Sequence, residues 1–251
     1  MARCAIPARG FSGVDTRPAA SKNFVAYSLQ RLGSDHIDVY RPARLDPAVP
    51  IEETVGALAE MVDRGWIRHI GLSEVGSETL RRASAVVHPV ADLQIEYSVA
   101  SRGVVDSLLS TCRELAVAAT AYGVLSRGLL SGHWSLGHAS ATDFRGMSPR
   151  FQPGNVEHNL QLVERVRTVA DGLGVTVARL ATAWVAAQGE DIIIPVIGAR
   201  RRDQLAESLG AASVVLDDAT LVRLDELFPP HAVGGDRYPA HSMAALDSER
   251  G

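Results

Sequence analysis

Length, composition and charge narrow the class of protein before any motif is considered. The chain has 251 residues, of which 46% are hydrophobic, and this is enough for one large α/β domain or two small ones. With 25 Lys and Arg against 29 Asp and Glu, the net charge of −4 argues against nucleic acid or an anionic membrane as partner. Cys4 and Cys112 are too few and too isolated for a disulfide framework or a metal site. No apolar run reaches the roughly 20 residues that span a bilayer, and no signal peptide opens the chain, so we expect a soluble cytoplasmic protein.

The predicted elements of the first half alternate between helix and strand. Segment 1–21 is expected to be irregular, because prolines and glycines interrupt it and no apolar period runs through it. Apolar spacing and short β-branched runs then predict the rest. The expected helices are Lys22–Leu32, Ile51–Arg64, Ser77–Val87 and Val104–Leu115, and the expected strands are Ile37–Tyr40, His69–Ser73, Leu93–Tyr97 and Ala118–Leu125.

The second half continues after a long irregular segment, expected from Ser126 to about Gly154. Helices are expected at Val156–Gly172, Thr176–Ala187, Arg202–Leu209 and Asp217–Leu227, with one strand at Ile192 and a polar tail at the end. The apolar run of that strand stops at Gly198, and Arg200, Arg201 and Arg202 follow before the next helix. A helix N-terminus flanked by guanidinium groups favours anions, so this turn predicts a phosphate site. An ordinary solvated helix start is the alternative.

This order of elements predicts the fold. Five strands, each followed by a helix, indicate a parallel sheet, which is either doubly wound or a (β/α)₈ barrel. No G-x-G-x-x-G follows the first strand, which argues against the usual dinucleotide-binding form of the doubly wound sheet. Five strands do not close a barrel. We therefore expect an α/β fold, a TIM (β/α)₈-type barrel that is N-terminally incomplete, with about five βα units (strands 4–8) over residues 22–251.

Five motifs, in register, resemble the aldo/keto reductase superfamily. In chain order they are SLQRLGSDHIDVY (Ser28–Tyr40), PIEETVGALAEMVDRGWIRHIGLSE (Pro50–Glu74), LQIEYS (Leu93–Ser98), AYGVLSRGLLSG (Ala121–Gly132) and IGARRRDQLAES (Ile197–Ser208). The resemblance covers the chain from about Lys22 onward. It implies a barrel that binds NADP(H) over its C-terminal rim and passes hydride to an aldehyde or ketone.

The resemblance also implies which residues hold the cofactor. Ser73 and Gln94 match positions that hydrogen-bond the nicotinamide carboxamide, and Tyr122 matches the ring that stacks on the nicotinamide. The remaining matches are Gly123, Leu125, Ser126 and Arg127 under the pyrophosphate, and Gly198, Ala199, Arg200, Arg201, Gln204 and Glu207 around the 2′-phosphate and adenine. Glu74 and Ser208 replace the more usual Asn. Arginine at the last turn favours NADP over NAD. Each of three residues also has a purely structural alternative. Gln94 is then a polar residue at a strand end, Tyr122 a ring in the core, and Ser73 a strand-end or capping hydroxyl.

The catalytic groups that the resemblance implies cannot be assigned in this chain. The family uses a tyrosine as general acid, a lysine that lowers the pKa of that tyrosine, an aspartate paired with the lysine, and usually a histidine. The Asp, Tyr and Lys belong to strands before Ile37, and the histidine position falls on Ala43. No lysine follows Lys22. We expect little or no carbonyl reductase activity from this chain alone, whether the sequence is a shortened reductase or the real product.

Partners and alternatives follow from the same observations. We expect a small carbonyl substrate, bound in an apolar rim pocket that Trp134, Phe144, Phe151 and Tyr238 help to line, and self-association through the open edges of the outer strands. A non-catalytic NADP(H)-binding or regulatory subunit is the first alternative, and Ala43 favours it. A phosphate-binding isomerase or aldolase is the second, although the barrel strands offer no lysine or paired carboxylates for it.

Overall fold

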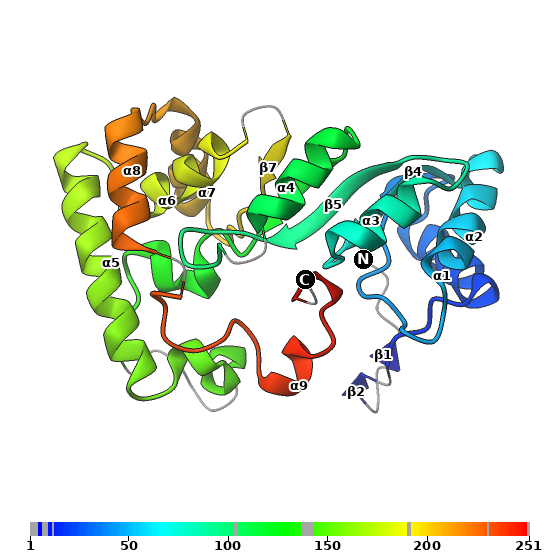
Figure 1. The fold of residues 1–251 in the computed structure, drawn as a ribbon, viewed down its shortest axis with the longest axis horizontal. Helices are drawn as coiled ribbons and strands as arrows, with labels where there is room; N and C mark the ends of the chain where they lie inside the picture. The colour runs from blue at the N-terminus through cyan, green and yellow to red at the C-terminus, as the bar shows by residue number, and fades with distance from the viewer. Residues whose placement is uncertain are drawn as a thin grey trace. The chain divides into compact units, whose positions relative to one another are not determined.

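A computed structural model describes residues 5–6, 10–11, 13–102, 105–136, 143–189, 192–229 and 231–249 (Figure 1). Within these residues one sheet has the strand order β3-β4-β5-β6-β7, and β4 pairs in parallel with both β3 and β5. Its strands are β3 Ile37–Tyr40, β4 Ile67–Ser73, β5 Val90–Glu96, β6 Ala118–Tyr122 and β7 Ile193–Pro195. A short antiparallel pair, β1 (Ala5–Ile6) and β2 (Gly10–Phe11), precedes it. The α/β order expected from the sequence is confirmed, with β3 and β7 at the sheet edges.

The expected helices are all present, with ends that differ by at most four residues. They are α1 Pro18–Leu32, α2 Ile51–Asp63, α3 Ser77–Ser84, α4 Val105–Glu114, α5 Asn155–Gly172, α6 Val177–Ala187, α7 Arg202–Leu209 and α8 Asp218–Leu227. The polar tail contains α9 Ala240–Met243. Short 3₁₀ segments lie at η1 Ser126–Ser131, which is kinked at Arg127 and Gly128, and at η2 Phe144–Met147, η3 Pro149–Phe151, η4 Gly210–Ser213 and η5 Asp247–Glu249.

Two boundaries and one segment differ from the sequence prediction. Helix α1 begins at Pro18, so the last four residues of the segment expected to be irregular are helical. Proline is favoured at the first position of a helix, where its missing N–H is not needed and its φ is already helical. Strand β6 ends at Tyr122, not Leu125, because Gly123 turns the chain at φ 70° and its carbonyl accepts the N–H of Ser126. The segment from Ser126 to Gly154 was expected to be irregular and instead contains η1, η2 and η3.

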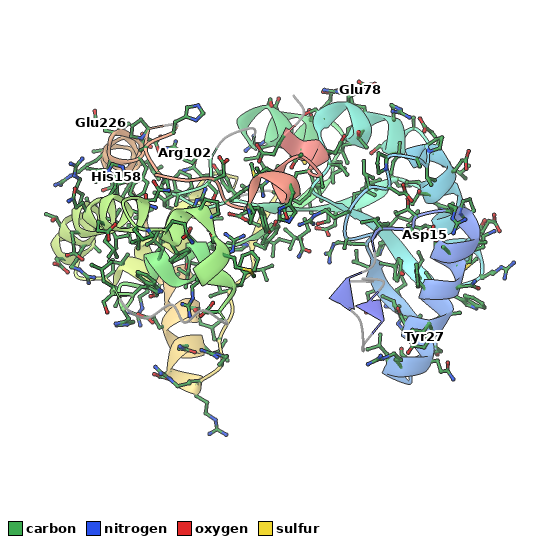
Figure 2. The ribbon with its side chains drawn as sticks, turned by 90° about the horizontal axis from the view of Figure 1, so that it is seen from below. Asp15, Tyr27, Glu78, Arg102, His158 and Glu226 are labelled. Carbon is green, nitrogen blue, oxygen red and sulfur yellow. The ribbon has the colours of Figure 1, made fainter. Side chains whose placement is uncertain are left out.

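The chain forms two compact units, which are described separately. The first unit contains residues 1–95, 107–119 and 245–251, and the second contains 96–106 and 120–244. In the first, α2 and β4 contribute fully buried aliphatic side chains, among them Leu58 and Leu72. In the second, the buried ring of Trp184 packs against Tyr97 with 5.4 Å between ring centroids. Arg102, labelled in Figure 2, stacks on Trp184 at 5.0 Å.

No single helix in the described part of the chain is long and apolar enough to cross a membrane. Helices α5 and α6 reach that length and composition only as a pair, and they are bent by 87° where they meet.

An ion pair in the first unit depends on a glycine. Arg41 follows β3, and its guanidinium pairs with the buried carboxylate of Asp92 on β5. Gly71 lies on β4 between those two strands, in register with Asp92. A Cβ atom placed on Gly71 would lie 2.5 Å from Cγ of Arg41. The arginine therefore crosses β4 over the one position that offers no side chain.

Replacing Gly71 by Ala is expected to destabilise the chain by about 1–3 kcal/mol, because the added methyl displaces an arginine stem that Asp92 holds in place. Urea unfolding followed by circular dichroism measures the change. Gly56, inside α2, is the matched control, since a Cβ placed there meets nothing within 4 Å. Gly56→Ala should stabilise by up to about 1 kcal/mol. Equal stability of the two variants would show that the arginine moves aside freely.

Candidate functional site

Ser73 and Gln94 lie side by side at the carboxyl ends of β4 and β5 in the first unit. The two residues are paired in register, and the N–H of Glu74 donates to the carbonyl of Gln94 at 3.0 Å. Ser73 is buried, and its Oγ has no hydrogen-bond partner among the described residues. Gln94 is half-buried. A buried hydroxyl without a partner, next to a side-chain amide, fits a group with both donors and acceptors, such as a carboxamide.

Glu74, which stands where the family usually has Asn, binds the end of the chain. Its backbone is left-handed, with φ 56°, a conformation that Asn adopts more readily than Glu. Its Oε2 accepts from Oγ of Ser248 at 2.8 Å, and its carbonyl accepts the N–H of Ser248 at 3.2 Å. Asp247 accepts the N–H of Gly76 at 2.9 Å, at the start of α3. The C-terminal residues are thus tied to the turn after β4, which the sequence analysis missed.

The residues expected under the pyrophosphate form a tight turn in the second unit. Gly123, Ser126 and Arg127 all have left-handed backbones, with φ of 70°, 45° and 56°. A Cβ on Gly123 would lie 3.0 Å from Cγ of Glu96, so glycine is required for this close approach. The carbonyl of Leu125 accepts the N–H groups of Gly128 and Leu130, at 2.8 and 3.1 Å. Backbone hydrogen bonds hold the turn in this shape.

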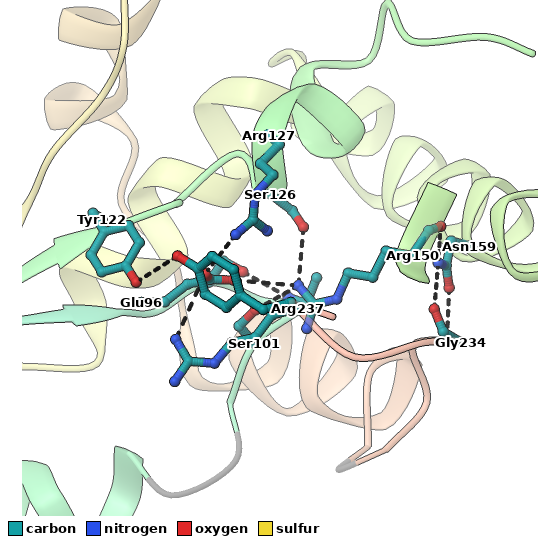
Figure 3. Close-up of polar contacts among 12 residues, drawn as sticks. Glu96, Ser101, Tyr122, Ser126, Arg127, Arg150, Asn159, Gly234 and Arg237 are labelled. Atoms are coloured by element: carbon teal, nitrogen blue, oxygen red, sulfur yellow. Dashed lines mark hydrogen bonds and ion pairs between the residues drawn. The ribbon is translucent and has the colours of Figure 1, made fainter. Parts of the chain in front are cut away.

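Two side chains of this turn point into a buried group of charges, the Glu96 cluster, which consists of Glu96, Ser101, Arg127, Arg150 and Arg237 (Figure 3). The Glu96 carboxylate lies 3.2 Å from Arg127, 3.6 Å from Arg150 and 3.7 Å from Arg237, and it accepts from Ser101 Oγ at 3.0 Å. Arg150 also donates to Oγ of Ser126 at 3.3 Å. Its burial lowers the pKa of Arg150, and the charge of Glu96 acts in the opposite direction. Ser126 and Arg127, both expected at the pyrophosphate, therefore have protein partners.

Tyr122 is the last residue of β6, which was expected to continue to Leu125, and it is half-buried. Its hydroxyl lies 3.0 Å from the hydroxyl of Tyr238, which comes from the C-terminal part of the second unit (Figure 3). Its carbonyl accepts the N–H of Tyr97 at 3.0 Å. Tyr122 is thus held at both its backbone carbonyl and its hydroxyl. The sequence suggested Tyr238 only as one of the aromatic residues of a rim pocket, not as the partner of Tyr122.

The arginine turn precedes α7, also in the second unit. Arg201 is the N-cap residue, and Oε1 of Gln204 accepts the N–H groups of Arg200 and Arg201 at 3.0 and 3.2 Å. Gln204, expected near adenine, therefore uses its side-chain oxygen to cap the helix. The guanidinium of Arg201 binds Asp203 through two hydrogen bonds, of 3.0 and 2.7 Å, which lower the pKa of Asp203. Both side chains are exposed. The carboxylate of Asp203 offsets part of the positive charge of Arg201.

The other residues of this turn are open to solvent. Gly198, Ala199 and Arg200 are exposed and lie outside any helix or strand. The pKa of Asp143 is lowered by hydrogen bonds from Arg145 and further by the charge of Arg200. Glu207 is half-buried on α7, and its carbonyl accepts Nε of Arg179 at 3.3 Å. The exposed guanidinium of Arg200 makes no ion pair among the described residues.

The expected cofactor residues thus fall into two groups. Ser73 and Gln94 are adjacent in the first unit, and the pyrophosphate turn, Tyr122 and the arginine turn belong to the second. Within the described residues, no three His, Cys, Asp or Glu side chains gather as metal ligands would.

Comparisons with known proteins agree with this architecture. Residues 6–228 match the model of the aldo/keto reductase family. The chain is 36% identical over 235 residues to probable aldo-keto reductase 1 of Glycine max, covering 93% of this chain and 67% of that protein.

Solved structures give the same result. The glycerol dehydrogenase AKR11B4 of Gluconobacter oxydans superposes with a TM-score of 0.79 at 28% identity, over 86% of this chain and 66% of that one. The thermostable aldo-keto reductase Tm1743, solved with the inhibitor epalrestat, gives 0.67 at 27% identity, over 84% of this chain and 67% of that one. This chain spans about two thirds of the length of these relatives. The family match begins at residue 6, earlier than the motifs at Lys22 suggested. The chain belongs to the aldo/keto reductase family.

Proposed function

We propose that this chain carries the NADP(H) site of an aldo/keto reductase, an enzyme that reduces aldehydes or ketones to alcohols, and that its own turnover is impaired. The observation that carries the proposal is the buried Ser73 hydroxyl, which has no hydrogen-bond partner among the described residues and lies beside the amide of Gln94. Burying a hydroxyl without a partner costs free energy, and such costs are common where a ligand group completes the site.

Each group of residues has a separate task in this proposal. Ser73 and Gln94 hold the nicotinamide carboxamide and fix its orientation. Tyr122 presents a ring face to the nicotinamide, so that only the other face is open. Arg200 pairs with the 2′-phosphate, because its guanidinium is exposed and Asp203 does not hold it. NADPH, when bound, supplies the hydride.

The proton required for carbonyl reduction has no evident donor among these residues. Burial raises the pKa of Tyr40 to about 12, away from the range in which a phenol donates near neutral pH. The single lysine of the chain, Lys22, pairs with Glu60 at 2.6 Å. Ala43 offers only a methyl group where the family usually has histidine. These observations favour a second candidate function, that of a non-catalytic NADP(H)-binding or regulatory subunit.

Titration with NADPH, followed by nicotinamide fluorescence, together with a turnover assay on an aromatic aldehyde, tests the proposal. We expect saturable binding with turnover at least about a hundred-fold below that of a full-length relative, since a positioned general acid contributes roughly 10²–10⁴-fold. Ser73→Ala should weaken NADPH binding, and Ser84→Ala, which removes another partnerless buried hydroxyl, should leave it unchanged. Absence of binding would refute the proposal. Turnover equal to that of full-length relatives would rule out the non-catalytic alternative.

A further inference from the structure

The hydroxyls of Tyr122 and Tyr238 form a pair that the proposed function does not explain. They are 3.0 Å apart, and both side chains are half-buried, so one hydroxyl donates to the other in a partly dry environment. Tyr122 belongs to β6, whereas Tyr238 lies more than a hundred residues later in the chain. A contact between such distant segments depends on how firmly the later one is held.

Charged groups hold the ring of Tyr238. The guanidinium of Arg127 lies 4.6 Å from the ring centroid of Tyr238, and that of Arg237 lies 5.7 Å from it. Both arginines pair with the buried carboxylate of Glu96 (Figure 3). Arg127 also lies 5.2 Å from the ring of Phe144, which packs edge-on against Tyr238 with 6.2 Å between ring centroids. Cation–π contacts of this kind are strengthened where water is excluded. The Glu96 cluster therefore fixes the arginines, and the arginines fix Tyr238.

The backbone before Tyr238 is anchored independently. Asn159 on α5 donates to the carbonyl of Gly234 at 2.9 Å and accepts the N–H of Gly234 at 2.8 Å. Gly235 has φ 82°, and a Cβ there would lie 2.7 Å from the carbonyl carbon of Pro149. A reciprocal amide pair and a turn that requires glycine leave this segment little freedom. Tyr238 thus meets Tyr122 from a fixed position.

We infer that Tyr238 is a positioning residue, which fixes the Tyr122 ring in the plane that receives the nicotinamide. The inference rests on the proposed function, and it assigns to the C-terminal segment a task in binding the cofactor. A ring whose hydroxyl is already bonded loses less freedom when a ligand stacks on it, so the stacking contributes more fully to affinity. The contribution should appear only for ligands that carry a nicotinamide.

Two ligands separate this role from a general effect on structure. NADPH contains the nicotinamide, and adenosine 2′,5′-bisphosphate contains the 2′-phosphate and adenine without it. Tyr238→Phe, which removes only the hydroxyl, should weaken NADPH binding by up to about five-fold, the upper limit that one neutral hydrogen bond sets. Binding of the bisphosphate should stay unchanged, and the midpoint of thermal unfolding should fall by only about 2–4 °C, as expected for the loss of one hydrogen bond. Tyr27→Phe, at an exposed tyrosine on α1, is the matched control (Figure 2).

Tyr122→Phe removes the same hydrogen bond from its other end and keeps the stacking ring. Its loss of NADPH affinity should equal that of Tyr238→Phe, and the double variant should lose no more than either. Unchanged NADPH affinity in Tyr238→Phe, or an equal loss for both ligands, would overturn the inference and leave the proposed function standing. Failure of the unmodified chain to bind either ligand would overturn both.

Discussion

Replacing Glu96 by Gln is expected to destabilise the folded chain by about 3 kcal/mol or more. The side chain is 1% exposed, and its carboxylate faces three guanidinium groups, of which those of Arg150 and Arg237 are only 7% exposed. Glutamine keeps the shape and removes the charge, so the arginines lose the buried carboxylate that all three of them face. Breaking a buried ion pair from one side typically costs about 3–5 kcal/mol, a large part of the stability of a typical domain.

Urea unfolding of the Glu96→Gln variant measures this effect, and Glu164→Gln is its control in the same unit. Glu164 pairs with Arg167 on the surface of α5 at 3.0 Å, where water screens the charges, so its loss should have little effect. Adding Arg150→Met to Glu96→Gln should recover part of the lost stability, because it removes one of the buried cations that faced the carboxylate. If Glu96→Gln unfolds at the same urea concentration as Glu164→Gln, the Glu96 carboxylate does not stabilise the folded chain.

The sequence predicts the elements of this fold well, because apolar spacing records which face of each helix or strand is buried. Strand β3 was predicted with both ends correct, since charged or polar residues flank its apolar run; both ends of α7 were predicted too, although none of its residues is buried. The closeness of Ser73 and Gln94 was implied only by the resemblance, in which both residues hold the carboxamide. The expected strand Leu93–Tyr97 placed Gln94 near its start, whereas β5 begins earlier, at Val90, and pairs Gln94 with Ser73.

The Glu96 cluster was beyond prediction, because its members come from β5, η1, η3 and the tail, and no local pattern links them. One signal was present: Glu96 is a charged residue at the end of an apolar strand, and such a residue needs a partner when it is buried. The identity of that partner depends on tertiary packing. The same holds for Ser248, whose bond to Glu74 joins residues that are 174 positions apart.

At the arginine turn, the sequence predicts the charges but not which of them pair. Three successive arginines predicted positive charge, and Asp203 follows them directly. Only the folded structure shows that Asp203 binds Arg201 through two hydrogen bonds, whereas Arg200 makes no ion pair among the described residues. Neighbouring charges cancel or add according to rotamers, which residue order does not specify. The expected contribution of Arg200 and Arg201 to phosphate binding is therefore unequal.

Replacing Arg200 by Ala is accordingly expected to weaken NADPH binding about ten-fold or more, the loss typical of a hydrogen-bonded charge pair with a phosphate. Arg201→Ala should weaken it only about two- to three-fold, since Asp203 already balances that charge. NADH lacks the 2′-phosphate, so its affinity should change less than two-fold in either variant. Fluorescence titration with the two nucleotides at a fixed, stated salt concentration measures both ratios.

The control for general loss of positive charge is Arg223→Ala on the exposed face of α8, which should affect neither nucleotide. An equal loss of NADPH and NADH affinity in Arg200→Ala would show that the arginine stabilises the turn and does not bind the 2′-phosphate. A larger loss in Arg201→Ala would mean that Arg201 exchanges Asp203 for the phosphate. Asp203→Asn would then tighten NADPH binding, because the competing carboxylate is gone. Under the proposed arrangement, Asp203→Asn changes NADPH affinity little, since Arg200 provides most of the charge that the phosphate meets.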